Sequence, residues 1–237
     1  MSNQLHNELK KEFQLERMIL FSDAVFAIAI TLLVLEIKIP DVHEDVSDKR
    51  ILIALGHLLP KFLGFFISFL LIGLYWVLHH RLFGFVTSYN KRLLILNLVF
   101  LFFIVFMPFS TGLYSEYAGS ELVRKQLKIP FTFYVLNFCC LGFVHHIMWR
   151  YVTNPAHKLT EPPIDPLTLR ITKFRSLLVP SVFLLMLPVA YLTNILIAIY
   201  MPMLIPIMLK ITNSRINQSH RKKLKSINDD SAPYTKS

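Results

Sequence analysis

A carboxylate inside an apolar stretch is the residue of this sequence with the clearest chemical consequence. Asp23 lies in the apolar run that starts after Arg17 and continues to Ile37. A charged group in the hydrocarbon of a membrane costs several kcal/mol, about 2.5–3.5 on insertion scales, so such a residue faces protein or water and has a partner there. Arg17 precedes Asp23 by six residues, which is too far for pairing within one helix. Each of them therefore requires a partner from another element.

Candidate partners lie in two later apolar runs. Trp76 has an N–H that can only donate, His79 and His80 follow it, and Asn97 can donate or accept. Each also has a simpler interpretation: an interfacial tryptophan, histidines at the start of a hydrated loop, and an asparagine bonding two helices. Our hypothesis is a clasp that locks the first helix against the second and third, formed by Arg17, Ser22, Asp23, Trp76, His80 and Asn97.

The composition indicates an all-α integral membrane protein. Hydrophobic residues make up 54% of the 237 residues, and 20 of them are Phe, which is very apolar for a soluble domain of this length. Residues 1–16 are polar and mixed in charge, so they do not resemble a cleaved signal, and the first apolar run is expected to remain as a helix. We predict a cytoplasmic segment over 1–16, a transmembrane domain over 17–211 and a basic cytoplasmic tail over 212–237.

Six apolar runs approach the 17–25 residues of a spanning helix. Four are clear, at 18–39, 51–78, 93–113 and 129–149. The stretch from Leu177 to Ile211 is too long for one helix, and we divide it into two short helices at Thr193-Asn194. Its prolines would kink these helices unless neighbours satisfy the freed carbonyls.

The distribution of Lys and Arg predicts that both termini are cytoplasmic, in a multi-pass protein of the cell membrane. With that orientation, 18 of the 25 basic residues fall on the inner side. The basic tail is then a flank attracted to the lipid bilayer, and nucleic acid is not an expected partner. The first outer loop is acidic, and it would either concentrate cations or be an ordinary solvated loop. Its acidic residues are Asp41, Glu44, Asp45 and Asp48.

The sequence contains no motif for a nucleotide, a metal or a covalent intermediate. Cys139 and Cys140 are adjacent in a predicted membrane helix, where they point apart and favour packing over redox chemistry. A membrane enzyme with a metal at two histidine pairs is a rival interpretation. It is disfavoured because adjacent histidines point in different directions, and both pairs, His79-His80 and His145-His146, fall at predicted inner helix ends.

A helical wheel of the first run separates Asp23 from an apolar stripe. At about 100° per residue, Phe21, Leu32 and Leu35 lie within about 40° of Ile28, and Thr31 lies about 60° away. Asp23 lies about 140° from Ile28. We therefore expect Asp23 to point into neighbouring helices while the stripe faces elsewhere.

Arg17-x-x-x-Phe21-Ser22-Asp23 resembles the RxxxFSD signature of the lysosomal-type transmembrane potassium channel family, in particular its bacterial and archaeal members. The likeness continues through AxxxAITLLVLEIKIP, through Trp76-x-x-His79-His80-Arg81, and through LLILNLVFLFFIVFMPFSTGL. It covers residues 14–113 strongly and the later helices by layout.

The resemblance implies a channel and no enzyme, with six helices per repeat and the first helix lining a central pore. Because this chain holds one repeat, the resemblance implies a homotetramer that passes monovalent cations, with no cofactor besides permeant K⁺. Carried over by position, hydrophobic constrictions fall on Ile28, Leu32 and Leu35, and a polar layer falls on Thr31.

Such a pore differs from a carbonyl filter of the TVGYG type, which this sequence lacks. A ring of Ile28 side chains offers no oxygen, so it favours the cation that loses water at least cost. We expect modest selectivity for potassium over sodium. The alternative is a secondary cation/proton transporter that uses Asp23 as proton carrier; against it, the chain contains no second copy of the FSD helix, and Asp23 lies near one end of its run.

Overall fold

The computed structural model describes residues 2–40, 47–117, 128–161, 166–205, 207–208, 210–211 and 214, with the side chains of 2–12, 166–168 and 170 excepted. Every regular element in these ranges is a helix, which confirms the predicted all-α class. The elements in chain order are α1 (Ser2–Leu35), α2 (Asp48–His57), α3 (Leu59–Phe83), α4 (Lys91–Val105), α5 (Met107–Tyr117), α7 (Lys128–Val152), η1 (Pro155–His157), α8 (Pro166–Leu192), α9 (Ile195–Tyr200) and η2 (Met201–Met203).

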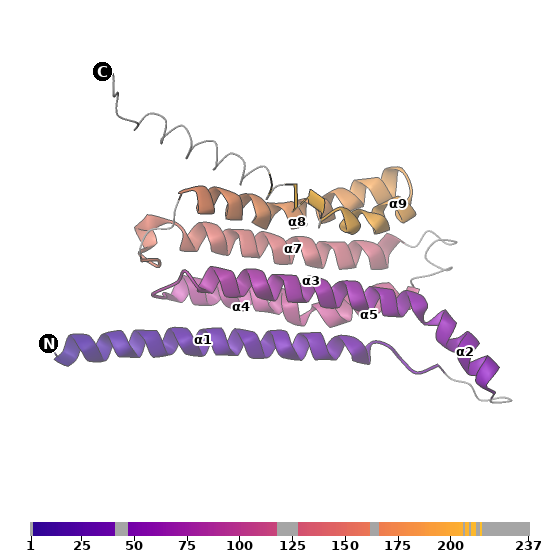
Figure 1. Cartoon of the computed structure of the whole chain (residues 1–237), viewed down its shortest axis with the longest axis horizontal. Coiled ribbons are helices and arrows are strands. Elements are labelled where there is room, and N and C mark those ends of the chain that lie inside the picture. Colours follow the sequence, from indigo (N-terminus) through magenta and orange to yellow (C-terminus); the bar gives the residue numbers. More distant parts are fainter. Residues whose placement is uncertain are drawn as a thin grey trace, which may run out of the picture.

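Five helical segments in the described ranges are long and apolar enough to cross a membrane. Their bounds are Phe13–Leu35, Leu59–Phe83, Lys91–Tyr117, Lys128–Val152 and Ile171–Leu192. In Figure 1 these segments run side by side along the long axis, as in a bundle of antiparallel helices. Such a bundle suits a membrane because each helix satisfies its own backbone hydrogen bonds.

The predicted second span, 51–78, is wrong in its bounds. α2 ends at His57 and α3 begins at Leu59, with Pro60 in the first turn of α3. Proline is tolerated there because the first N–H groups of a helix have no intrahelical partner. The long helix therefore extends to Phe83, while α2 projects away from the bundle at one end (Figure 1).

The predicted third span is formed by two helices with a break at Phe106. Pro108 lacks the N–H that would bond the carbonyl of Ile104 in a continuous helix. The amide of Ser110 bonds the carbonyl of Phe106 at 3.1 Å, so the helical path resumes within one turn. α4 and α5 together make one span.

The predicted break at Thr193-Asn194 is confirmed. α8 ends at Leu192, and the side chain of Asn194 accepts a hydrogen bond from the amide of Leu196 to cap α9. α8 itself starts earlier than predicted and passes through Pro180 and Pro188 without ending. Beyond α9 the chain tightens into η2 around Pro202, so the described residues of the predicted sixth helix do not form one continuous span. The tail from 212 onward lies outside the described residues except at 214.

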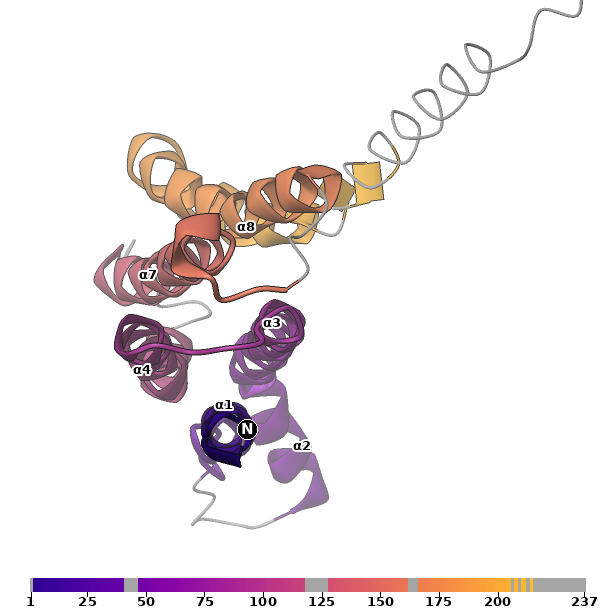
Figure 2. The same cartoon turned by 90° about the vertical axis from the view of Figure 1, so that its left-hand side faces the viewer.

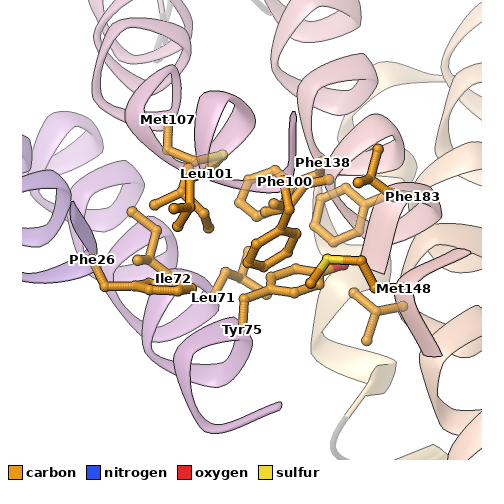
Figure 3. Packing of buried hydrophobic residues seen from close by; sticks show 14 of the residues in the cluster. Phe26, Leu71, Ile72, Tyr75, Phe100, Leu101, Met107, Phe138, Met148 and Phe183 are labelled. Carbon is orange, nitrogen blue, oxygen red and sulfur yellow. The ribbon is translucent and has the colours of Figure 1, made fainter. Parts of the chain in front are cut away.

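The helices are arranged in layers that leave α1 at one edge. Viewed end-on, α1 lies beside α3 and α4, α7 follows, and α8 with α9 forms the opposite edge (Figure 2). The core between these layers is largely aromatic. Figure 3 shows its close packing, and several of its largest members are at most 1% exposed: Phe26, Ile72, Tyr75, Phe100, Phe138 and Phe183.

The N-terminus, the α3–α4 connection and the α7–α8 connection lie at the same end of the bundle (Figure 1). Hydrogen bonds join the last two of these: the amide of Thr87 donates to the carbonyl of Leu159 at 2.9 Å, and the hydroxyl of Ser88 donates to the carbonyl of Lys158 at 2.9 Å. At the opposite end, Lys61 forms an ion pair with Glu116 at 2.7 Å. We call the end with the N-terminus the N-terminal end.

Gly142 provides a direct test of the packing of α7. A Cβ at this position would lie 2.6 Å from the hydroxyl oxygen of Tyr75 and 2.7 Å from the Cβ of Pro180 on α8. Gly142→Ala should therefore destabilise the protein by about 1–3 kcal/mol, as overpacking does. The measurement is the melting temperature in detergent, followed by size-exclusion chromatography after heating. Gly73→Ala is the matched control, because nothing lies within 4 Å of a Cβ there; an equal effect at both glycines would contradict the close approach at Gly142.

Candidate functional site

α1 has one face packed into the bundle and one face uncovered in the single chain. The packed residues recur at spacings of three or four, as expected for one helical face: Leu15, Met18, Ser22, Phe26, Ala29 and Leu33, all at most 8% exposed. Ile28 is 58% exposed, Leu32 39% and Leu35 70%, and Thr31 is exposed as well. The structure thus separates the predicted stripe from the packed face.

A chain of hydrogen bonds joins the packed face of α1 to α4 and α3. His79 Nε2 donates to Asn97 Oδ1 at 2.8 Å, Asn97 Nδ2 donates to Ser22 Oγ at 2.9 Å, and Ser22 Oγ donates to the carbonyl of Met18 at 2.8 Å. All three side chains are at most 1% exposed. Each donor therefore has an acceptor, which matters because a buried polar group without a partner costs about 1–3 kcal/mol.

Asp23 is bonded to the helix that the sequence suggested. Trp76 Nε1 donates to Asp23 Oδ1 at 2.9 Å. Asp23 is half-buried and Trp76 is 41% exposed, so the bond lies at the margin of the α1–α3 contact. It supplies the carboxylate with the partner that a charge at this depth requires.

Aromatic rings surround the buried histidine. The ring of His79 stacks on Phe100 with centroids 5.3 Å apart and planes 8° apart, and Phe26 of α1 lies 5.6 Å from His79. Phe26 also lies 5.9 Å from Phe100. The aromatic contacts thus hold the imidazole in the orientation that directs Nε2 to Asn97.

Three residues of the predicted motif do not enter this network. His80 is exposed, with its ring 5.9 Å from that of Trp76, because it lies about 100° around α3 from His79. Arg17 is exposed and lies over the ring of Phe13 at 5.9 Å, and Phe21 is 52% exposed. Both fall about 20° from Ile28 on the wheel, so they share the uncovered face of α1 and cannot reach α3 or α4.

The hydroxyl of Thr31 donates its proton to backbone carbonyls of its own helix. Its Oγ1 lies 2.9 Å from the carbonyl oxygen of Ile28 and 3.1 Å from that of Ala27. Because the proton is directed to the backbone, the lone pairs of Oγ1 remain available on the uncovered face.

A second buried polar cluster was not predicted from the sequence. Thr111 Oγ1 donates to Ser68 Oγ at 2.9 Å, and Ser68 lies 3.1 Å from the hydroxyl of Tyr134, which joins α5, α3 and α7. Asn137 Nδ2 donates to Ser110 Oγ at 3.1 Å. The sequence did contain one indication of this cluster, because its polar residues lie inside predicted apolar spans, where polar side chains commonly bond between helices.

Other predicted groups are located as follows. Asp41, Glu44 and Asp45 of the acidic loop lie outside the described residues, and Asp48 is in the first turn of α2. Cys139 and Cys140 are free thiols. Among the described side chains, no three His, Cys, Asp or Glu residues gather as metal ligands would.

Fold and site together define a multi-pass helical membrane protein whose first helix is held by polar bonds and presents an apolar face. Residues 17–108 match the family model described as "Endosomal/lysosomal potassium channel TMEM175". A protein named as a potassium channel in Streptomyces collinus is 33% identical over 155 residues, which are 65% of this chain and 72% of that protein. Another in Chamaesiphon minutus is 34% identical over 165 residues, with 68% and 79% covered. The chain belongs to the TMEM175 family.

Animal and structural relatives agree with this assignment. The chicken protein named "Endosomal/lysosomal proton channel TMEM175" is 37% identical over 139 residues, which are 55% of this chain and 28% of that longer protein. The crystal structure of a homologue of the lysosomal potassium-selective channel TMEM175, from Chamaesiphon minutus, matches with a TM-score of 0.67 at 27% identity. The match covers 86% of this chain and 98% of that one.

The bond between Asp23 and Trp76 can be tested with a double-mutant cycle. Trp76→Phe removes the N–H donor and keeps an aromatic ring, so it should lower the melting temperature in detergent. Combined with Asp23→Ala it should add less than the sum of the two effects, with a coupling of about 0.6–1.7 kcal/mol, the range for polar contacts between membrane helices.

The control for this cycle is the other tryptophan. Trp149 Nε1 is buried without a hydrogen-bond partner, so Trp149→Phe loses ring packing but no hydrogen bond. Its effect should add to that of Asp23→Ala without coupling. Strict additivity for Trp76→Phe as well would show that the Asp23–Trp76 bond does not contribute to stability.

Proposed function

We propose that this chain is one subunit of a homotetrameric cation channel that prefers potassium to sodium. In this proposal both termini are cytoplasmic, six transmembrane segments form each subunit, and four copies of α1 surround a central pore in the cell membrane. Conduction is passive, and no enzymatic step is involved. The names of the bacterial relatives, which are potassium channels, support the choice of ion.

The observation that carries the proposal is the uncovered apolar stripe on an edge helix. α1 is the least buried of the five spans. In its most apolar part, 28% of the residues are buried within the chain, against 61% for α7. Figure 2 shows α1 at the margin of the subunit, where it is accessible to neighbouring copies. Family membership favours a shared axis over lipid as the environment of this margin.

In the proposed pore, Ile28, Leu32 and Leu35 form successive hydrophobic rings. At a rise of about 1.5 Å per residue, these rings span roughly 10 Å, about a third of the hydrocarbon thickness. Rings without oxygen select by the cost of removing water from the cation and can close by dewetting. The Thr31 oxygen, with its proton directed to the backbone, adds the polar layer beside Ile28.

The bonds of the packed face support the same interpretation, because they fix the rotation of α1. Ser22 and Asp23 are held to α4 and α3, and the opposite side of the helix must then face away from the subunit. A transporter that used Asp23 as its proton carrier would need this carboxylate to be released from Trp76 in each cycle. The chicken relative is named as a proton channel, so proton flux belongs among the measurements.

Reconstitution of the full chain in liposomes with opposed potassium and sodium gradients tests the function directly. A reversal potential displaced toward the potassium equilibrium potential, with unitary current steps in planar bilayers, is expected. A proton gradient alone, read with a pH-sensitive dye, measures proton permeation in parallel. Flux strictly coupled to protons without unitary currents would replace the channel with the transporter.

Ile28→Ala tests the assignment of Ile28 to a hydrophobic ring of the pore. Shortening the side chain should widen the constriction, so the conductance should rise and the permeability ratio of potassium to sodium should fall, because the ion keeps more of its water. Val34→Ala is the matched control, since Val34 is also exposed on α1 but lies about 120° from Ile28 on the wheel. Size-exclusion chromatography with light scattering checks the tetramer. Unchanged currents in Ile28→Ala would remove Ile28 from the constriction.

A further inference from the structure

The apolar run of the first helix contains a carboxylate besides Asp23, and the proposed pore leaves it without a role. Glu36 directly follows Leu35, the last residue of α1, at the end of the bundle opposite the N-terminal end. It comes seven residues after Ala29, which is 1% exposed, so the two lie within about 20° of each other on the helical wheel. The register of the helix therefore directs Glu36 toward its own subunit, about 80° away from Ile28.

The Glu36 carboxylate lies directly against α5. A Cβ built on Gly112 would lie 2.6 Å from the Cδ of Glu36 and 3.2 Å from its Cγ, and it would overlap the carboxylate oxygen Oε2. The carboxylate thus occupies the space that a side chain at position 112 would need, and only glycine leaves this space free. The contact places the carboxylate between the end of α1 and α5.

The charge of Glu36 is not compensated within the part of the chain that the structure describes. No described donor bonds its carboxylate, and no described cation forms an ion pair with it. Lys61 lies at the same end of the bundle, but it is bonded to Glu116 at 2.7 Å, four residues after Gly112 on α5. Glu36 is half-buried, so its carboxylate keeps the access to water that a charge without a partner requires.

We propose that Glu36 sets the electrostatic potential at the outer mouth of the pore, and that Gly112 positions its carboxylate there. This inference rests on the proposed function, in which four copies of α1 surround one axis with both termini cytoplasmic. Four Glu36 carboxylates then form a ring of negative charge one residue beyond the ring of Leu35. Charged rings of this kind concentrate cations at a pore entrance. Because the carboxylates lie beside α5 and off the axis, they attract cations without coordinating them.

The distance from the axis determines the size of the effect. A helix with its side chains is about 10–12 Å in diameter, so a carboxylate beside α1 lies roughly 10 Å from the proposed axis. Four charges at about 10 Å raise the local concentration of a monovalent cation about threefold at 0.1 M salt, where the Debye length is about 10 Å. At 1 M salt the Debye length is about 3 Å, and the increase falls to about 1.1-fold. The ring therefore raises conductance at low salt and does not distinguish potassium from sodium.

The test measures the unitary conductance of the full chain in planar bilayers at about 0.1 M and about 1 M KCl, the two concentrations compared above. Glu36→Gln removes the charge and keeps the shape of the side chain. Its conductance should fall about threefold at the lower concentration and stay at the native level at the higher one, with an unchanged permeability ratio of potassium to sodium. Glu36→Asp keeps the charge and should conduct as the native chain does.

Glu161→Gln is the matched control, because it removes an exposed carboxylate of the α7–α8 connection, at the N-terminal end of the bundle. It should leave the conductance unchanged at both salt concentrations. Native conductance of Glu36→Gln at low salt would overturn the ring and leave the proposed channel in place. An equal loss at both concentrations would also overturn it, in favour of a structural role. Absence of unitary currents in the native chain would overturn the channel and the ring together.

Gly112→Ala tests the contact that positions the carboxylate. The added Cβ should displace the Glu36 side chain from α5 toward the open side of α1, nearer the axis, and so raise the conductance at low salt. In the Glu36→Ala background there is no carboxylate to displace, and Gly112→Ala should have no effect. Equal effects of Gly112→Ala in the two backgrounds would overturn the role of Gly112.

Discussion

The hydrogen-bond chain from His79 through Asn97 to Ser22 is the constraint on which the orientation of α1 depends. Its members come from α3, α4 and α1, and its last proton returns to the backbone of α1 at Met18. Apolar contacts alone leave the rotation of a membrane helix poorly specified, because lipid is as apolar as the helix surfaces. A rotation of α1 by one residue, about 100°, would move Ser22 away and leave the buried Nδ2 of Asn97 without its acceptor. The chain therefore fixes which side of α1 stays uncovered.

The packing around this chain gives it the low-dielectric surroundings in which polar bonds are both strong and costly to break. Phe26 and Phe100 enclose the imidazole of His79 from α1 and α4. The Asp23–Trp76 bond lies outside this enclosure, since Trp76 is partly exposed. The two contacts thus have different roles: the buried chain sets the rotation of α1, and the marginal bond gives the carboxylate of Asp23 a hydrogen-bond donor.

Much of this site could be predicted from the sequence, and the exceptions have physical causes. The requirement of Asp23 for a partner, and Trp76 as a candidate, followed from the cost of an intramembrane charge. The choice of His80 over His79 failed because Ile72, Tyr75 and His79 lie on the buried face of α3, and a helix that is apolar nearly all round does not reveal which face is buried. Arg17 was assigned to the clasp because it requires a partner, and Phe21 was grouped with it by the signature, but the wheel already placed Phe21 on the stripe. A signature therefore groups residues that lie on two faces of one helix.

The helix boundaries show a different limit. Apolar runs predicted which segments are long enough to cross a membrane. The breaks at Leu58 and Phe106 depend on how the backbone accommodates Pro60 and Pro108, and hydropathy contains no information on this accommodation. α1 extends back to Ser2 because polar residues continue a helix as readily as apolar ones. The second polar cluster, at Ser68, Thr111 and Tyr134, depends on contacts between distant parts of the chain, and a single sequence contains no record of them.

The contrast between α7 and α1 bears on the environment of α1. α7 is the least apolar of the five spans and the most buried, whereas α1 is among the most apolar and is the least buried. Lipid alone would accept any apolar face, whatever the arrangement of its side chains. The face of α1 is ordered: it is opposite the polar bonds, it includes a hydroxyl whose proton is already satisfied at Thr31, and it is rigidly oriented by Asn97. Fixing the rotation of a helix to a fraction of a turn is what the proposed pore requires, because there the side chains of α1 would have to meet those of identical copies at one axis.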